Sequence, residues 1–238
     1  VGYQGWFGAE GDGMNMGFRH YTSRDRNDLS KSSSAIHDQR GITFEMWPDL
    51  SEFTEAEKFD TGFNHKDGSV AQLFSSAHPE TVNRHFKWMS EYGIDGAFLQ
   101  RFPVGLKNSS DNRNKKFLNK VLNNVRQASI KNKVGWALMY DLSGLKKGDI
   151  DKILIPDLKA LLKKDFTNDP YYIKHQGKPL ISIWGAGFQE RKYTLTEIQR
   201  LVSALKDESQ LGDFAVMLGI PYYWRTLGDD TTGDKRLH

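Results

Sequence analysis

Asp141 is the residue whose type and position best fit chemistry, because it follows a long apolar run. Residues 134–139 are apolar or glycine without polar alternation, which is typical of a strand buried on both faces. Catalytic groups of α/β barrels lie at the carboxyl ends of such strands. We therefore expect Asp141 to act as a general acid, a general base or a carboxylate that anchors a substrate. The alternative is that Asp141 caps the turn that follows.

Amide, acidic and aromatic side chains also stand near the ends of the other apolar runs. Arg101 could hold an acidic group bidentately, or it could form an interior salt bridge with Asp141 or Glu45. Asp49 could reach a substrate or cap a turn, and His20 could donate to a substrate hydroxyl or be an ordinary surface histidine. The residues expected to bind substrate are Gln4, Trp6, His20, Glu45, Trp47, Asp49, Gln100, Arg101, Tyr140, Trp184, Tyr222 and Trp224. Polar groups mixed with rings in this way favour an enzyme that acts on a polar, ring-shaped substrate.

Strands and helices that would position these residues can be read from the hydrophobic pattern. Six segments are expected as buried strands, namely Val1–Phe7, Ile42–Trp47, Gly96–Arg101, Val134–Tyr140, Leu180–Trp184 and Phe214–Ile220. Helical spacing of apolar residues predicts four helices, at Pro79–Tyr92, Asn114–Lys131, Asp149–Lys164 and Thr194–Asp207. The last helix opens with Thr194-Leu-Thr-Glu197, the spacing of a capping box.

The alternation of strands and helices predicts parallel strands joined by right-handed crossovers. An open doubly wound sheet and a (β/α)8 TIM barrel both fit this pattern. No G-x-G-x-x-G segment joins a strand to a helix, and long loops at residues 8–41 and 48–78 follow the first two expected strands, which favours the barrel. A barrel needs eight strands, so we expect residues 1–238 to be one barrel domain whose last two strand–helix units are missing. A smaller fold, or strands that the pattern does not reveal, are the alternatives.

Composition limits the classes of function. The net charge of +3, from 33 basic and 30 acidic residues, is too balanced to indicate a nucleic-acid partner. The chain has no cysteine, which excludes disulfides, thiolate metal sites and a cysteine nucleophile. The sequence contains no run of 18 apolar residues, so it predicts no membrane span. The acidic and amide residues near Asp12 lack calcium-loop spacing, so we expect no metal and no cofactor. Val1 opens a strand-like segment, so we expect that a leader was removed or precedes this sequence.

Four motifs in order along the chain resemble glycoside hydrolase families 71 and 99. The motifs are Tyr3-Gln-Gly-Trp-Phe7, Phe44-Glu-Met-Trp-Pro-Asp49, Gly93-Ile-Asp-Gly-Ala-Phe-Leu-Gln-Arg-Phe102 and Ile181-Ser-Ile-Trp-Gly185. The nearest likeness is to a group of bacterial proteins named xylosidase/arabinosidase. The resemblance implies a (β/α)8 barrel that hydrolyses α-linked bonds of an oligo- or polysaccharide, in a secreted or periplasmic protein. Family 99 enzymes are endo-acting α-mannosidases and mannanases, and family 71 enzymes cleave α-1,3-glucan.

The chain departs from the family 99 pattern at the expected fourth strand. Family 99 has a Glu-Pro-Tyr segment there, whereas this chain has Met139-Tyr-Asp-Leu-Ser143, which leaves Asp141 as the carboxylate available for that role. The second family carboxylate would come from late in the barrel, beyond His238. A carbohydrate-binding protein that has lost catalysis is the alternative. A (β/α)8 enzyme acting on phosphorylated metabolites is a weaker rival, because residues 180–190 contain no clear glycine-rich phosphate loop.

Overall fold

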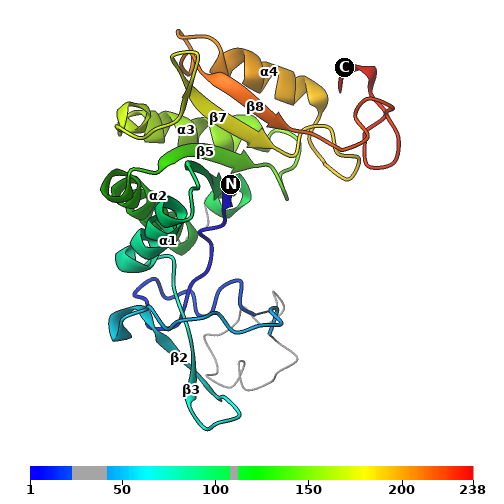
Figure 1. Ribbon diagram of the computed structural model, residues 1–238. Helices are drawn as coiled ribbons and strands as arrows, with labels where there is room; N and C mark the ends of the chain where they lie inside the picture. Colours follow the sequence, from blue (N-terminus) through cyan, green and yellow to red (C-terminus); the bar gives the residue numbers. More distant parts are fainter. Residues whose placement is uncertain (23–41, 108–111, 238) are drawn as a thin grey trace. The chain divides into compact units, whose positions relative to one another are not determined.

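The computed structural model describes residues 1–22, 42–107 and 112–237, and the chain divides into two compact units. The first, which we call the sheet unit, comprises Val1–Tyr3, Gly93–Ser110 and Lys133–His238. The second, the hairpin unit, comprises Gln4–Tyr92 and Asp111–Asn132. We describe each unit by itself (Figure 1).

The sheet unit is built on five parallel strands. In spatial order they are β1 (Gly2–Tyr3), β4 (Gly96–Arg101), β5 (Gly135–Asp141), β7 (Lys178–Trp184) and β8 (Ala215–Gly219). The short strand β6 (Lys174–His175) pairs antiparallel with the start of β7. Spatial order therefore follows chain order, and all five parallel strands bring their carboxyl ends to one edge. We call this edge the carboxyl edge.

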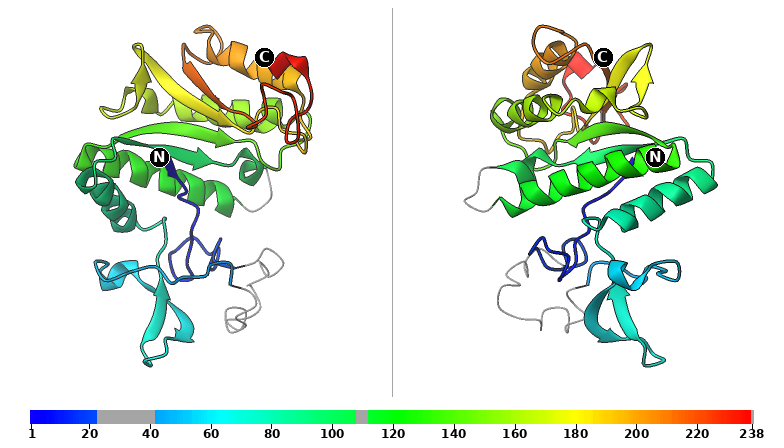
Figure 2. Two further views of the ribbon diagram at one scale, coloured as in Figure 1. Left: turned by 45° about the vertical axis from the view of Figure 1, so that its right-hand side comes forward. Right: turned by 90° about the vertical axis from the view of Figure 1, so that its left-hand side faces the viewer.

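Helices of the sheet unit lie on one face of its sheet. Figures 1 and 2 show α3 (Ile155–Leu162) and α4 (Leu195–Leu205) on the same side of β7 and β8. A strand order without reversal, with helices on one side, is the winding of a barrel wall, whereas a doubly wound sheet reverses at a switch point. Among the described residues the sheet is open, with β1 and β8 as its outermost parallel strands. The structure thus establishes a mixed α/β fold with a parallel sheet.

Local sequence explains where these helices begin. Thr194 Oγ1 accepts the Glu197 backbone N–H at 3.2 Å, and the Glu197 carboxylate accepts the Thr194 N–H at 2.9 Å, so the predicted capping box is confirmed. Ahead of α3 the chain forms a π-helical segment, η5 (Ile150–Leu154). Pro156 stands in the first turn of α3, where its lack of a backbone N–H is tolerated.

The hairpin unit contains two helices and a two-stranded sheet. Helices α1 (Pro79–Glu91) and α2 (Arg113–Asn132) lie side by side, and strands β2 (Phe59–Asn64) and β3 (Val70–Leu73) form an antiparallel hairpin (Figure 1). The short 3₁₀ helix η3 (Glu55–Glu57) precedes the hairpin. The unit has a small apolar cluster surrounded by partly buried rings: Ala9, Phe18, Tyr21 and Leu73, with Phe7, Phe44, Trp47, Phe59 and Phe63.

Two parts of the predicted strand pattern are wrong. Residues 42–47 form no strand; Ile42 makes one isolated bridge to Thr22, and the rest of the segment is irregular. The first strand covers Gly2–Tyr3 only. The segment 48–78, which was expected to be a loop, contains the β2–β3 hairpin. The Asp67-Gly68 pair in its turn is a sequence signal for a hairpin that the prediction did not use. The other four strands and all four helices are confirmed, with shifted ends, and residues 23–41 of the first long loop lie outside the described residues.

No helix in the described ranges is long and apolar enough to cross a membrane.

Candidate functional site at the carboxyl edge

Asp141 is the last residue of β5, and both of its carboxylate oxygens accept hydrogen bonds. Oδ2 accepts from Gln100 Nε2 at 2.6 Å, and Oδ1 accepts from the Ser143 backbone N–H at 2.8 Å. The residue is only 4% exposed. Because Gln100 belongs to the neighbouring strand β4, the contact between them ties the carboxyl ends of two strands together.

Register places Trp184 beside this pair. Asp141 is the register partner of Trp184 on β7, and Gln100 is the partner of Met139, two residues before Asp141. Side chains alternate between the faces of a sheet, so Gln100, Asp141 and Trp184 lie on one face. Trp184 is 43% exposed, which leaves part of its indole ring available to a ligand next to the carboxylate. The structure thus brings three of the predicted site residues together.

The indole of Trp184 lies across the end of β8. A Cβ atom added to Gly219, the register partner of Trp184, would stand 2.1 Å from the ring. The position therefore requires a glycine on steric grounds. Two backbone N–H groups just after Trp184, from Gly185 and Ala186, donate to the Gly219 carbonyl at 2.9 and 3.0 Å. The loop after β7 is in this way fixed to the end of β8.

Tyr193, which the sequence did not single out, closes the loop after β7. Its hydroxyl donates to the Gly185 carbonyl at 2.6 Å. Burial raises the pKa of Tyr193 well above its usual range; the charge of Arg191 opposes this shift, and the charges of Asp141 and Glu190 add to it. The hydroxyl therefore stays protonated at neutral pH and remains a donor.

Arg101 and Tyr140 lie on the opposite face of the sheet from Gln100 and Asp141. Both are fully buried, and both contact Asp157 of α3. Arg101 donates from Nε and Nη2 to the two Asp157 oxygens at 2.7 and 2.8 Å, and the Tyr140 hydroxyl donates to Oδ2 at 2.7 Å. This is the interior salt bridge that was the alternative for Arg101, with a partner that the sequence did not indicate. The contacts give both residues a role in joining the sheet to α3.

Tyr222 and Trp224 lie in the turn that follows β8. Tyr222 is 85% exposed. The guanidinium of Arg225 lies over the Trp224 ring, 5.2 Å from its centroid. The turn therefore presents rings and a cation beyond the carboxyl edge.

The remaining predicted site residues belong to the hairpin unit. Trp6 and His20 are stacked, with ring centroids 4.9 Å apart and planes 20° apart, and His20 has a positive φ of 62°. Trp47 packs edge-on against Phe44 and His65. The other three are exposed: Gln4, Glu45 and Asp49. Hydrogen bonds from Ser51, above all from its backbone N–H at 2.9 Å, lower the pKa of Asp49, so Asp49 closes a local turn.

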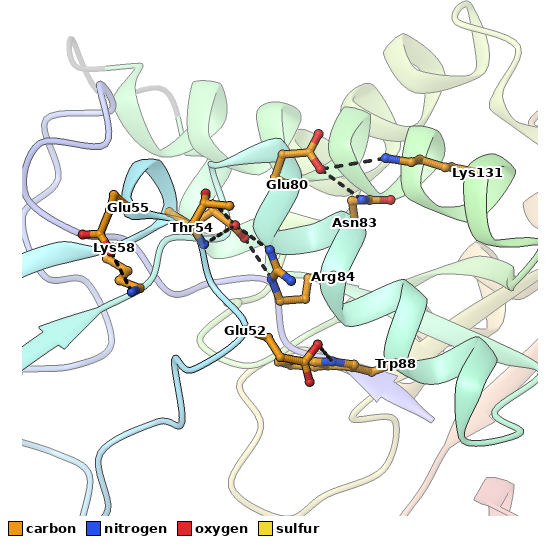
Figure 3. A network of polar contacts seen from close by, with 10 residues as sticks. Glu52, Thr54, Glu55, Lys58, Glu80, Asn83, Arg84, Trp88 and Lys131 are labelled. Atoms are coloured by element: carbon orange, nitrogen blue, oxygen red, sulfur yellow. Dashed lines mark hydrogen bonds and ion pairs between the residues drawn. The ribbon is translucent and has the colours of Figure 1, made fainter.

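A second polar cluster in the hairpin unit surrounds a buried carboxylate. Figure 3 shows Arg84 of α1 reaching towards Thr54. The Glu57 carboxylate accepts from Arg84 Nη2 at 2.7 Å and from the Thr54 N–H at 2.9 Å. Its pKa is lowered, because these hydrogen bonds outweigh burial, the largest single effect, which acts to raise it. The next residue, His85, is partly buried among the rings of Phe53, Phe74 and Trp88, and removal from water lowers its pKa to about 4.

Groups of three or more potential metal ligands are absent from the described ranges.

Comparisons with known proteins give distant structural matches only. No protein-family model matches the sequence, and no curated protein matches it. Among solved structures, the family 99 endo-α-mannosidase of Bacteroides thetaiotaomicron in complex with bis-tris-propane matches with 13% identity and a TM-score of 0.46. A second structure of that family 99 enzyme matches with 11% identity and a TM-score of 0.42. Each match covers 76% of this chain, and 40% and 43% of the respective mannosidase chains, so the chain spans less than half the length of these proteins. Similarity at this level does not assign an activity, which must come from the geometry of the carboxyl edge.

Proposed function

We propose that this chain carries the catalytic region of a glycoside hydrolase that cleaves α-linked bonds in an oligo- or polysaccharide, with Asp141 as a catalytic carboxylate. The observation that carries the proposal is the group formed by Asp141, Gln100 and Trp184. A carboxylate at the end of a central parallel strand stands next to a partly exposed indole on the same face. Sugars stack on such rings through their apolar C–H faces, while carboxylates act on the glycosidic bond.

The hydrogen bonds of Asp141 favour particular roles. Glycosidases use two carboxyl groups, one of which protonates the leaving oxygen while the other acts as base or nucleophile. Both Asp141 oxygens accept N–H donors, and neither is engaged as an O–H donor. This arrangement suits a nucleophile, a base or an anchoring group better than a general acid. Gln100 would hold the carboxylate in one orientation, as a positioning residue.

The proposal extends to the fold. The five parallel strands, wound in one direction, would be part of a closed (β/α)8 barrel, which needs three more strands between β8 and β1. Closure would turn the face that carries Gln100, Asp141 and Trp184 into the barrel interior. The second carboxylate would then stand at the carboxyl end of one of these additional strands, across the mouth of the barrel from Asp141.

Hydrolysis by the full-length protein tests this function. We expect new reducing ends from α-linked mannans or glucans, and Asp141→Asn should lower turnover on the order of 10³-fold or more. The amide of Gln100 can rotate so that its oxygen accepts from the new amide, which preserves the fold. Asp213→Asn, at the exposed amino end of β8, is the matched control and should keep wild-type turnover. Wild-type turnover in Asp141→Asn would remove Asp141 from catalysis.

A carbohydrate-binding protein without catalysis is the second candidate. It is favoured by the near-complete burial of Asp141, whose two oxygens already have partners within the protein. Binding of α-glycans without any release of reducing ends, in the wild type as in Asp141→Asn, would establish this alternative.

A further inference from the structure

The turn after β8, Tyr222–Arg225, presents aromatic rings to solvent. Tyr222 is 85% exposed and Tyr223 is 43% exposed, and their rings meet edge to face with centroids 5.1 Å apart. Trp224 follows directly. Single exposed aromatic residues are ordinary on protein surfaces, but three consecutive rings at the carboxyl edge form a surface on which sugar rings can stack.

Hydrogen bonds hold this turn in place. The Asp230 carboxylate accepts the backbone N–H groups of Tyr222 and Tyr223, at 3.3 and 3.4 Å. The Asp230 carbonyl in turn accepts the N–H of Gln189, in the loop after β7 that begins at Trp184. A further backbone bridge joins this loop to Thr231. The turn is therefore built on the same loop framework as the indole beside Asp141, which makes it a fixed surface next to the proposed cleavage site.

Arg225 supplies an unpaired cation on this surface. Its guanidinium lies over Trp224 and is exposed, and within the described ranges it has no hydrogen bond or ion pair. Arg200, by contrast, is an exposed arginine of the same unit that pairs with Asp151 at 2.9 Å. The planar N–H fork of an exposed guanidinium matches a carboxylate or sulfate group in geometry and charge.

We propose that the turn Tyr222–Arg225 binds an acidic saccharide unit, with Tyr222 against the sugar ring and Arg225 on its carboxylate or sulfate group. The inference rests on the proposed function and deepens it, because it makes the substrate an anionic glycan that extends beyond the sugars next to Asp141. A neutral glycan would leave the Arg225 donors unused and would gain only the stacking contact.

Binding to matched acidic and neutral glycans tests the proposal. The probes are hexagalacturonate with its methyl ester, and sulfated with unsulfated maltohexaose, titrated calorimetrically against the full-length protein carrying Asp141→Asn, which prevents cleavage. We expect the acidic member of at least one pair to bind about tenfold more tightly, and the preferred pair identifies carboxylate or sulfate as the group bound. Equal binding within both pairs, or no binding of any probe, would overturn the proposal.

Variants of the turn separate its two contributions. Arg225→Gln should abolish the acidic preference, and Arg225→Lys should retain part of it, because lysine keeps the charge without the planar fork. Tyr222→Ala should weaken acidic and neutral probes alike. Arg200→Gln removes the same charge from α4 and should leave the preference intact; an equal loss there would reduce the effect to net charge and refute a site at Arg225.

Failure of the proposed function has a different signature. Acidic preference that depends on Arg225, without hydrolysis by the wild-type protein, would refute catalysis and leave this binding site standing. Hydrolysis that depends on Asp141, without any preference for acidic glycans, would support catalysis and refute the binding site at Arg225.

Discussion

Gln100 and Arg101 are neighbours in the sequence, yet they serve different parts of the molecule. Gln100 donates to Asp141 on one face of the sheet, and Arg101 pairs with Asp157 of α3 on the other face. The sequence predicted that both residues end a buried strand. It could not predict their faces, because a strand buried on both sides lacks the polar alternation that marks its two faces. Because the face of Arg101 was not predicted, its partner Asp157, on a helix 56 residues away, was not predicted either.

Trp184 illustrates a dependence that no motif reveals. The sequence identified its ring as a candidate, but the requirement for a glycine at position 219 follows only from the β7–β8 register. The lack of a side chain at position 219 is thus what allows the Trp184 ring to lie where it does.

Gly219→Ala should move the Trp184 ring. The added Cβ would stand 2.1 Å from the indole at an otherwise permitted backbone conformation, so the ring must shift. We expect the variant to lose about 1–3 kcal/mol of unfolding free energy and to change its tryptophan fluorescence and glycan affinity. Denaturant unfolding and a binding titration measure these effects. Gly228→Ala, where the added atom meets only an ordinary contact at 3.7 Å, is the control. If both variants behave alike, Trp184 does not lie over Gly219.

At the scale of elements, hydrophobic period and end signals predicted four of the strands and the four α-helices of the described residues. The capping box at Thr194 is the clearest case, because a local sequence rule and the observed contacts agree. Residues 42–47 were misleading because Ile42, Phe44 and Met46 alternate as in a strand. In the structure the segment is irregular, and the partly buried rings of Phe44 and Trp47 pack against the small apolar cluster. Aromatic residues are common in strands because their side chains suit a half-buried surface. Rings on an irregular segment can be half-buried in the same way, so their presence does not prove a strand.

Helix α1 carries the clearest pH-dependent group, His85. Its folded pKa of about 4 lies below the usual 6.5, chiefly because of burial, with a further lowering by Arg84 and an opposing effect of Glu57. The unfolded chain therefore binds more protons between these values. His85 should stabilise the protein fully above pH 6.5, and this contribution, on the order of 3 kcal/mol, should be lost as the pH falls towards 4. The lowered pKa of Glu57 acts in the same direction at still lower pH, below its usual value of 4.5.

His85→Phe should flatten this dependence. Denaturant unfolding at pH 8 reports the packing cost of the substitution, and the difference between pH 8 and pH 5 isolates the titration. The variant should lose less unfolding free energy between the two values than the wild type does. An unchanged difference would show that other groups cause the acid sensitivity.

At the scale of the whole molecule, the sequence predicted parallel strands and crossover helices, and the structure adds their order. The expected spacing of about 40 residues between strands fails between β1 and β4, because residues 4–95 connect them and contain most of the hairpin unit. An inserted unit with its own small core carries the same apolar patterns as a strand–helix repeat, so composition and period cannot separate the two. Strand order, by contrast, is a property of long-range pairing that no local pattern encodes.

The central claim is that the carboxyl edge around Asp141 is where a saccharide is cleaved. A crystal structure of the full-length Asp141→Asn protein with an oligosaccharide substrate tests it most directly. We expect a sugar ring in van der Waals contact with the Trp184 indole and an anomeric carbon or glycosidic oxygen within about 3.5 Å of the side chain at position 141. A saccharide bound elsewhere, with no sugar atom near position 141, would contradict this assignment.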